Sequence, residues 1–413
     1  MDISIAFGKR KHTLSDILVY ISIIELILGG AGHVIGIGAL GIRLFILAAI
    51  FLYEIYLLFG DKLTFEKPNR ILIYVLAIFI IGLVHGIMDN PGNALNEFVG
   101  YTPFFLSPFY IYYFQHRGNI KKVQNVVLNS SFILAILQLL LWSYCLLHGQ
   151  GAYISTQSLL DRYNYGFLAY IGPIPRLFFK TAIFISVGFF ITFADLLQSG
   201  ISKKRIIGCI IFGLSILTSF TVGIYAFTAL GLFLIFLLSN KKISYDKLFK
   251  YIILVIILMI ILLFRFNVLK VLSARFSGDY TMGYKGTQGI EILRKFIKNP
   301  ILGYGLGYPI VINYGYQLLD SYSFEIMWLQ LLLHLGIIGF GVYVSHIIAT
   351  LKQLYTKFKT ALKDNNTYLI FFVSVIFICL DSFTNPYMNN AIGILFYDLA
   401  VGVAYSKSKS EVS

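Results

Sequence analysis

Two carboxylates at the end of the segment from residue 266 to residue 325, together with basic side chains along it, could act on a substrate that carries phosphate. These carboxylates are Asp320 and Glu325. Ammonium and guanidinium groups bind phosphate oxygens, and a carboxylate in an apolar, partly desolvated site beside cations can serve as a general base. An acidic residue in the first turn of a helix is often only a partner of the helix dipole, so both interpretations of Glu325 stay open.

The basic residues fall on or beside this segment and an earlier one, residues 149–176. They are Arg162, Arg176, Lys180, Arg265, Lys270, Arg275, Lys285, Arg294, Lys295 and Lys298. Solvated charge remains the alternative for any single residue, because long loops are partly exempt from the rule that keeps cations on the cytoplasmic side of a membrane. As a set, these residues predict an anionic ligand.

The stretch KNPILGYGLGY, residues 298–308, looks like a nucleotide-binding glycine loop. A dinucleotide fingerprint has the spacing G-x-G-x-x-G between a strand and a helix, whereas Gly303, Gly305 and Gly307 are spaced G-x-G-x-G. We therefore predict a turn that allows close backbone packing and leads the chain towards Glu325, and no phosphate cradle.

An amphipathic helix is predicted directly before this turn, over residues 286–298. Its apolar positions 290, 292–293 and 296–297 have the spacing of a helix that lies on a membrane surface. Asn299 and Pro300 end it, because proline cannot continue a helix and disfavours helical geometry in the residue before it.

The composition defines the elements that must position these residues. Of the 413 residues 58% are hydrophobic and 13% charged, and the mean hydropathy is +0.80, which excludes an ordinary soluble domain. We predict an all-α polytopic membrane protein of about twelve helices, each of about 20 mostly apolar residues. The predicted spans are 14–30, 42–59, 70–88, 98–115, 126–148, 177–198, 206–221, 222–239, 248–266, 327–350, 367–381 and 388–405.

Lysine and arginine predict the orientation of these helices. Seven basic clusters occupy every second loop of a twelve-helix chain whose two termini are both cytoplasmic. Residues 1–265 then form helices 1–9 with an outer loop at 149–176, residues 266–325 form a large extracytoplasmic loop, and residues 326–413 form helices 10–12. The net charge of +14 is largely this topology signal, with anionic membrane lipids as its partner, and implies no nucleic acid.

Metal and disulfide chemistry is not predicted. Cys145, Cys209 and Cys379 all fall inside predicted helices, and the histidines near helices, such as His334, lack metal-ligand spacing. A packed or interfacial histidine is the simpler interpretation. We expect no metal and no cofactor.

A pair of motifs resembles the polymerase and ligase superfamily of bacterial O-antigen and capsule assembly. The first, N-P-[LI]-L-G-x-G-x-G, spans residues 299–307, and the second, L-G-I-I-G, spans residues 335–339. The resemblance implies a metal-independent glycosyltransferase with GT-C-like architecture in the bacterial cytoplasmic membrane. Its substrate would be an oligosaccharide on undecaprenyl diphosphate, used on the periplasmic or extracellular side, and its partners would include a flippase and a chain-length regulator.

The resemblance also implies roles for individual residues. Lys285 occupies a position that is usually arginine, and Arg176 matches an arginine that ends the earlier outer loop. We assign the diphosphates to Arg176, Arg275, Lys285 and Arg294, with Lys180, Arg162 and Lys298 in reserve, and the acceptor proton to Glu325 or, second, Asp320.

Two alternatives remain. Ligases carry His-Asn where this chain has Glu325 and Ile326, so a polymerase is favoured over a ligase. A flippase for the same lipid-linked units should carry its cations within the helices and show internal repeats, whereas the cations here lie on outer loops.

Overall fold

A computed structural model describes most of the chain. The described residues are 4–7, 10–32, 36–37, 40–60, 69–116, 119–239, 281–314, 318–361 and 365–406. The predicted helix 248–266 and the predicted phosphate ligand Arg275 lie outside them. The chain divides into two compact units, residues 1–26, 37–126 and 284–413 in the first and residues 27–36 and 127–283 in the second.

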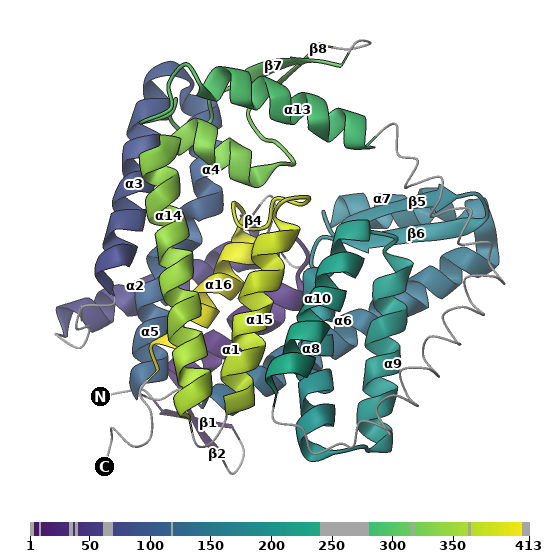
Figure 1. Ribbon diagram of the computed structural model, residues 1–413. Coiled ribbons are helices and arrows are strands. Elements are labelled where there is room, and N and C mark those ends of the chain that lie inside the picture. The colour runs from purple at the N-terminus through teal and green to yellow at the C-terminus, as the bar shows by residue number, and fades with distance from the viewer. Residues whose placement is uncertain are drawn as a thin grey trace. The chain divides into compact units, whose positions relative to one another are not determined.

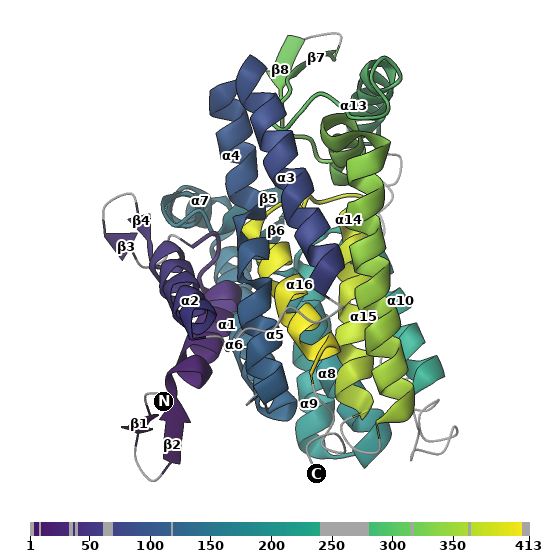
Figure 2. The same ribbon diagram turned by 90° about the vertical axis from the view of Figure 1, so that its left-hand side faces the viewer.

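The first unit is mainly helical (Figures 1 and 2). Its elements are β1 (Ser4–Phe7), β2 (Arg10–Thr13), most of α1 (Leu14–Leu28), β4 (Leu40–Gly41), α2 (Ile42–Phe59), α3 (Asn69–Asp89), α4 (Pro91–Tyr101), η1 (Thr102–Leu106), α5 (Ser107–His116), α13 (Thr281–Phe296), β7 (Ile310–Asn313), β8 (Leu318–Ser321), α14 (Met327–Thr360), α15 (Asn365–Asp381) and α16 (Ala391–Ala404). A further short strand, β3 (Gly36–Ile37), lies at the boundary between the units and pairs with β4.

Aromatic rings form the core that joins α3, α4, α14 and α16. The rings of Phe79 and Tyr101 stack with centroids 4.1 Å apart, and Phe104 packs edge-on against Tyr343 and Tyr397. All five side chains are buried. Large rings bury much apolar area and stack in preferred geometries, so this cluster holds these four helices together.

The second unit is a set of helices with one hairpin. Its elements are α6 (Ile120–His148), which begins in the first unit, η2 (Gly149–Ala152), α7 (Tyr153–Arg162), β5 (Gly166–Ile171), β6 (Ile174–Phe179), α8 (Ile183–Ser199), α9 (Lys203–Thr218) and α10 (Val222–Leu238). Strands β5 and β6 are antiparallel, with Gly166 opposite Phe179 and Ile171 opposite Ile174. The predicted break near Thr221 is confirmed, because α9 ends at Thr218 and α10 begins at Val222.

Four helices among the described residues are long and apolar enough to cross a membrane: Ile42–Phe59, Arg70–Asp89, Ile120–Arg162 and Met327–Thr360. Shorter apolar helices cover Ile183–Ser199, Val222–Leu238, Asn366–Asp381 and Ala391–Ala404. The chain is therefore a mostly helical polytopic membrane protein. The helix count of twelve and the GT-C-like architecture stay predictions.

Several features of the predicted helix pattern differ from the structure. The span 98–115 is broken into α4, η1 and α5, because Pro103 lacks the N–H that a continuous helix would use. The span expected to begin at residue 177 begins at Ile183, since residues 174–179 pair in a hairpin instead. Helix α14 starts at Met327, as its predicted span does, but Glu325 precedes the helix and does not lie in its first turn. The chain is also not purely α-helical, since short antiparallel hairpins join several helices.

Candidate functional site

An ion pair connects the two sequence elements that were expected to do chemistry. Nζ of Lys285, on α13, lies 2.9 Å from Oε2 of Glu325, just before α14. The Lys285 side chain is mostly buried and that of Glu325 is half exposed. The structure thus brings a predicted cation and the predicted base into direct contact, at a place that solvent can reach.

A third segment contributes to the same place. Nζ of Lys285 also donates a hydrogen bond of 2.7 Å to the carbonyl oxygen of Thr384, in the loop between α15 and α16. That loop is held by Asp381, the last residue of α15, whose buried carboxylate accepts from the side chain of Asn385. The ammonium group is therefore fixed by two oxygen atoms from two different elements.

A small apolar cluster fixes α13 above the start of α14. Ile292 of α13 is buried together with Ile310 and Ile312 of β7, Phe324, and Leu333 of α14. The strands β7 and β8 pair antiparallel, with Ile310 opposite Ser321, so the hairpin presents its buried face to the helix. Burial of each such side chain contributes about 1.5–3 kcal/mol to folding stability. The packing therefore holds α13, and with it Lys285, in a fixed position.

Two stacked tyrosines lie next to the ion pair. The rings of Tyr284 and Tyr314 are 4.3 Å apart and nearly parallel, at 7°. Burial raises the pKa of the Tyr314 hydroxyl well above its ordinary value, and the hydrogen bond with Tyr284 adds to the rise. The phenol stays neutral at physiological pH and can exchange hydrogen bonds with a neutral hydroxylated ligand.

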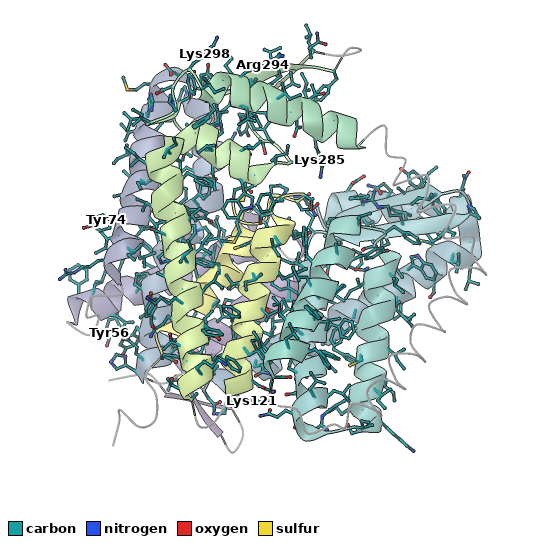
Figure 3. The ribbon with its side chains drawn as sticks, viewed as in Figure 1. Tyr56, Tyr74, Lys121, Lys285, Arg294 and Lys298 are labelled. Atoms are coloured by element: carbon teal, nitrogen blue, oxygen red, sulfur yellow. The ribbon has the colours of Figure 1, made fainter. Side chains whose placement is uncertain are left out.

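The other predicted groups of this segment lie elsewhere on it. Arg294 pairs with Glu291 at 2.7 Å and is 70% exposed, and Lys298 is exposed just beyond the end of α13. Figure 3 shows both on the side of α13 opposite Lys285. Asp320 is exposed on β8, opposite Val311 in the hairpin. Of the two predicted bases, Glu325 is the one that the described contacts join to a predicted phosphate ligand, Lys285.

The glycine stretch forms a turn that hydrogen-bonds to two helices. Gly336 has φ +63° inside α14, and this kink leaves the carbonyl groups of Leu333 and His334 without helical partners. The N–H of Tyr304 donates to Leu333 at 3.0 Å, and the N–H of Gly305 donates to His334 at 2.9 Å. The turn thereby satisfies carbonyl groups that a straight helix would have satisfied itself.

The turn also approaches α3 at backbone distance. The N–H of Leu306 donates to the carbonyl oxygen of Gly82 at 2.9 Å. Gly305 has φ +84°, and a Cβ atom there would lie 2.4 Å from the backbone nitrogen of Gly86. The predicted role of the glycines in close packing is consistent with this geometry; Gly303 and Gly307 also have positive φ values. Asn299 and Pro300 stand at the start, where the Asn299 amide donates to the Gly303 carbonyl.

A buried polar network behind the turn was not found by sequence reasoning. Glu97 of α4 accepts hydrogen bonds from the N–H of Gly307, from Nε2 of Gln330 at 2.9 Å and from Nδ1 of His334 at 2.9 Å. Nε2 of His334 lies 3.2 Å from the carbonyl oxygen of Tyr308. Glu97 and His334 are both buried. As expected, His334 is a packed histidine. One feature of the sequence could have indicated this network: Glu97 is the one acidic residue between Asp89 and Asp161.

The second unit carries the remaining predicted cations around its hairpin. Arg176 of β6 donates from Nε to the carbonyl oxygen of Ser219 at 3.3 Å, and its guanidinium carbon lies 4.8 Å from the ring centre of Phe167. Lys180, directly after β6, donates to the side chain of Asn164. Arg162 is exposed at the end of α7. Arg176 is thus tied to a backbone carbonyl group and Lys180 to a side chain of their own unit.

Within the described ranges, no group of three or more His, Cys, Asp or Glu side chains is arranged to hold a metal ion. The three cysteines are unpaired thiols, and Cys145 is buried.

These features define a polytopic membrane protein with a site made of a cation and a carboxylate. The site lies on the segment from α13 to Glu325, here called the capping segment, at one end of α3 and α14. The chain is similar to the O-antigen polymerase of Shigella flexneri, with 26% identity over 419 residues, which is 97% of this chain and 98% of that protein. No family model matches. The full-length similarity confirms the resemblance to the O-antigen polymerase and ligase superfamily that the motif pair predicted.

Proposed function

We propose that the protein polymerises lipid-linked oligosaccharide repeat units into O-antigen or capsular polysaccharide on the outer face of the bacterial cytoplasmic membrane. The observation that carries the proposal is the contact between Lys285 and Glu325 at 2.9 Å, in a chain that resembles an O-antigen polymerase from end to end. The basic clusters support cytoplasmic termini and therefore an outer position for the segment around α13.

In the proposed reaction, Lys285 receives the diphosphate of the donor. An undecaprenyl diphosphate leaves readily only when its developing negative charge meets a cation. The Lys285 ammonium is already held by the Thr384 carbonyl oxygen, so its position is fixed before the ligand arrives. A diphosphate carries more charge than one carboxylate and would displace Glu325 from the ion pair. The assignment of the diphosphates to Arg176 and Arg275 stays a prediction from the sequence.

Glu325, once released, takes the proton. The acceptor hydroxyl oxygen forms a bond to the anomeric carbon of the growing glycan, and the bond between that carbon and the diphosphate oxygen breaks with its electron pair. Inversion follows because attack and departure occur on opposite sides of the carbon. Tyr284 and Tyr314 lie beside the ion pair and can stack on or hydrogen-bond to the sugars.

The ligase alternative receives no support from the comparison, since the similar protein is a polymerase. The flippase alternative predicts cations within the helices, whereas Lys285 lies on α13, a helix of the capping segment. We propose a chain-length regulator and a flippase as cellular partners, because a polymerase of this kind needs a supply of outer-leaflet units.

The test is reconstitution of the purified protein in liposomes with synthetic undecaprenyl diphosphate repeat units, with the product ladder resolved on a gel. Glu325→Gln should lower the transfer rate by about 10²–10⁴-fold, the range for a well-placed acid or base. Because a solvent-accessible ion pair stabilises a fold by only about 0–1 kcal/mol, the variant should stay folded, and its loss of activity reports chemistry.

Asp320→Asn is the matched control, since it neutralises the second predicted base on the neighbouring hairpin without touching Lys285. It should keep most of the transfer rate. Elongation by Glu325→Gln at the wild-type rate would remove Glu325 from the active site, and a large loss in Asp320→Asn instead would move the base to the hairpin. A parallel reaction with a metal chelator should give an unchanged ladder.

A further inference from the structure

We infer that the outward surface of α13 and the turn after it docks onto the anionic phospholipid leaflet, and that Arg294 and Lys298 bind lipid phosphates there. This inference is independent of the proposed polymerase reaction. From the sequence, Arg294 and Lys298 were expected to bind the donor diphosphate. Here the phosphate groups that they bind belong to membrane lipids.

An exposed apolar stripe runs along α13 on the side away from its core. Ile290, Leu293 and Ile297 recur at intervals of three and four residues, which places them on one side of a helix. All three are exposed, Ile297 to 72%, whereas Ile292 of the same helix is fully buried. Helix α13 is thus apolar on two sides, and among the described residues only the side of Ile292 belongs to a buried core.

The stripe continues without a break onto a helix that can cross the membrane. Ile301 and Leu302 of the turn are exposed, and the N–H groups of Ile337 and Ile338 of α14 donate to the carbonyl oxygens of Pro300 and Ile301. Ile337 and Ile338 are exposed in turn. Since α14 is a candidate membrane span, its exposed apolar face meets lipid, and the stripe on α13 extends the same face.

The length and direction of the helices place α13 at the edge of the hydrocarbon layer. Helix α14 is kinked at Gly336, and its part after the kink, residues 337–360, is about 36 Å long at about 1.5 Å per residue. This part alone can cross a core of about 30 Å, so residues 327–335 before the kink stand at its edge. Helix α13 runs across the end of α3 and α14 rather than along them (Figures 1 and 2). A helix in that orientation lies in the plane of the interface.

Charge decides which partner fits this surface. Arg294 and Lys298 are four residues apart and share the side of α13 next to the stripe. Lys285 precedes Arg294 by nine residues, about two and a half turns, and so points to the opposite side, as Figure 3 shows. A single diphosphate on Lys285 therefore cannot also meet Arg294. An apolar stripe bordered by cations matches acyl chains bordered by anionic headgroups.

The experiment measures the depth of a nitroxide label attached to cysteine in place of Ile297. The three native cysteines are first changed to alanine, in a background verified to unfold like the wild type. Depth is read from the relative accessibility of the label to oxygen, which enters lipid, and to a polar nickel complex, which stays in water. Leu52, exposed on α2, serves as the lipid reference position and Ser323 as the aqueous one.

The label at 297 should be accessible to oxygen, like the one at 52, but should lie at a shallower depth, about 5–10 Å into the headgroup and acyl boundary. Phosphatidylglycerol added to phosphatidylcholine liposomes should draw it deeper, and the double variant Arg294→Gln and Lys298→Gln should lose that response. Free access of the nickel complex, as at 323, would overturn the inference. Exclusion of both reagents would also overturn it, because the surface would then be covered by protein, and so would an unchanged lipid response in the double variant.

Discussion

A methyl group added to Gly305 tests the packing of the turn most directly. Alanine at this position must adopt φ +84°, and its Cβ atom would lie 2.4 Å from the nitrogen and 2.8 Å from the Cα of Gly86. A left-handed conformation costs an L-residue about 1–2 kcal/mol, and overpacking a rigid contact costs about 1–3 kcal/mol. Backbone atoms of α3 cannot move aside as a side chain could, so we expect Gly305→Ala to destabilise the protein by about 2–5 kcal/mol.

Gly286→Ala is the matched control for this variant. Gly286 lies in α13, and no atom lies within 4 Å of a Cβ built there. Alanine is about 0.5–1 kcal/mol more favourable than glycine inside a helix, so the control should be as stable as the wild type or slightly more stable.

The assay is reversible unfolding in mixed micelles, with helical circular dichroism followed against the fraction of sodium dodecyl sulfate. Gly305→Ala should lower the midpoint, whereas Gly286→Ala should leave it unchanged or raise it slightly. If Gly305→Ala unfolds at the wild-type midpoint, the turn does not pack against α3 as described, and the close approach between Gly305 and Gly86 is refuted.

Two further variants examine the buried network and the cation. In Glu97→Gln the amide NH₂ would face the Gly307 N–H or another donor, and one unsatisfied buried group lowers the free energy of unfolding by about 1–3 kcal/mol. The control Glu291→Gln, at the exposed pair with Arg294, should change the free energy of unfolding by less than about 1 kcal/mol. Equal midpoints for the two variants in the same assay would contradict the network. Lys285→Met keeps the length of the side chain but removes its charge, so the KM for the lipid diphosphate donor should rise and kcat should fall in the liposome reaction. A donor KM and kcat equal to the wild-type values would exclude a diphosphate contact.

The site shows where sequence reasoning was sufficient and where it failed. Lys285 and Glu325 were both singled out, because residue type and predicted side of the membrane are local properties of the sequence. Their pairing across 40 positions depends on how α13 packs on β7 and α14, which no spacing rule encodes. The same holds for Glu97, whose partners Gly307, Gln330 and His334 all lie more than 200 residues away.

By itself, the sequence determined that this is a polytopic membrane protein whose basic residues fall mostly in seven clusters along the chain, and it indicated the superfamily from two short motifs. Hydropathy and charge act residue by residue, so they can be read along the chain. Only the tertiary structure decided that Pro103 divides a predicted span, that the kink at Gly336 binds the glycine turn, and that Lys285 and Arg294 face opposite ways. These outcomes depend on backbone contacts between distant segments and on the direction in which each helix turns its side chains.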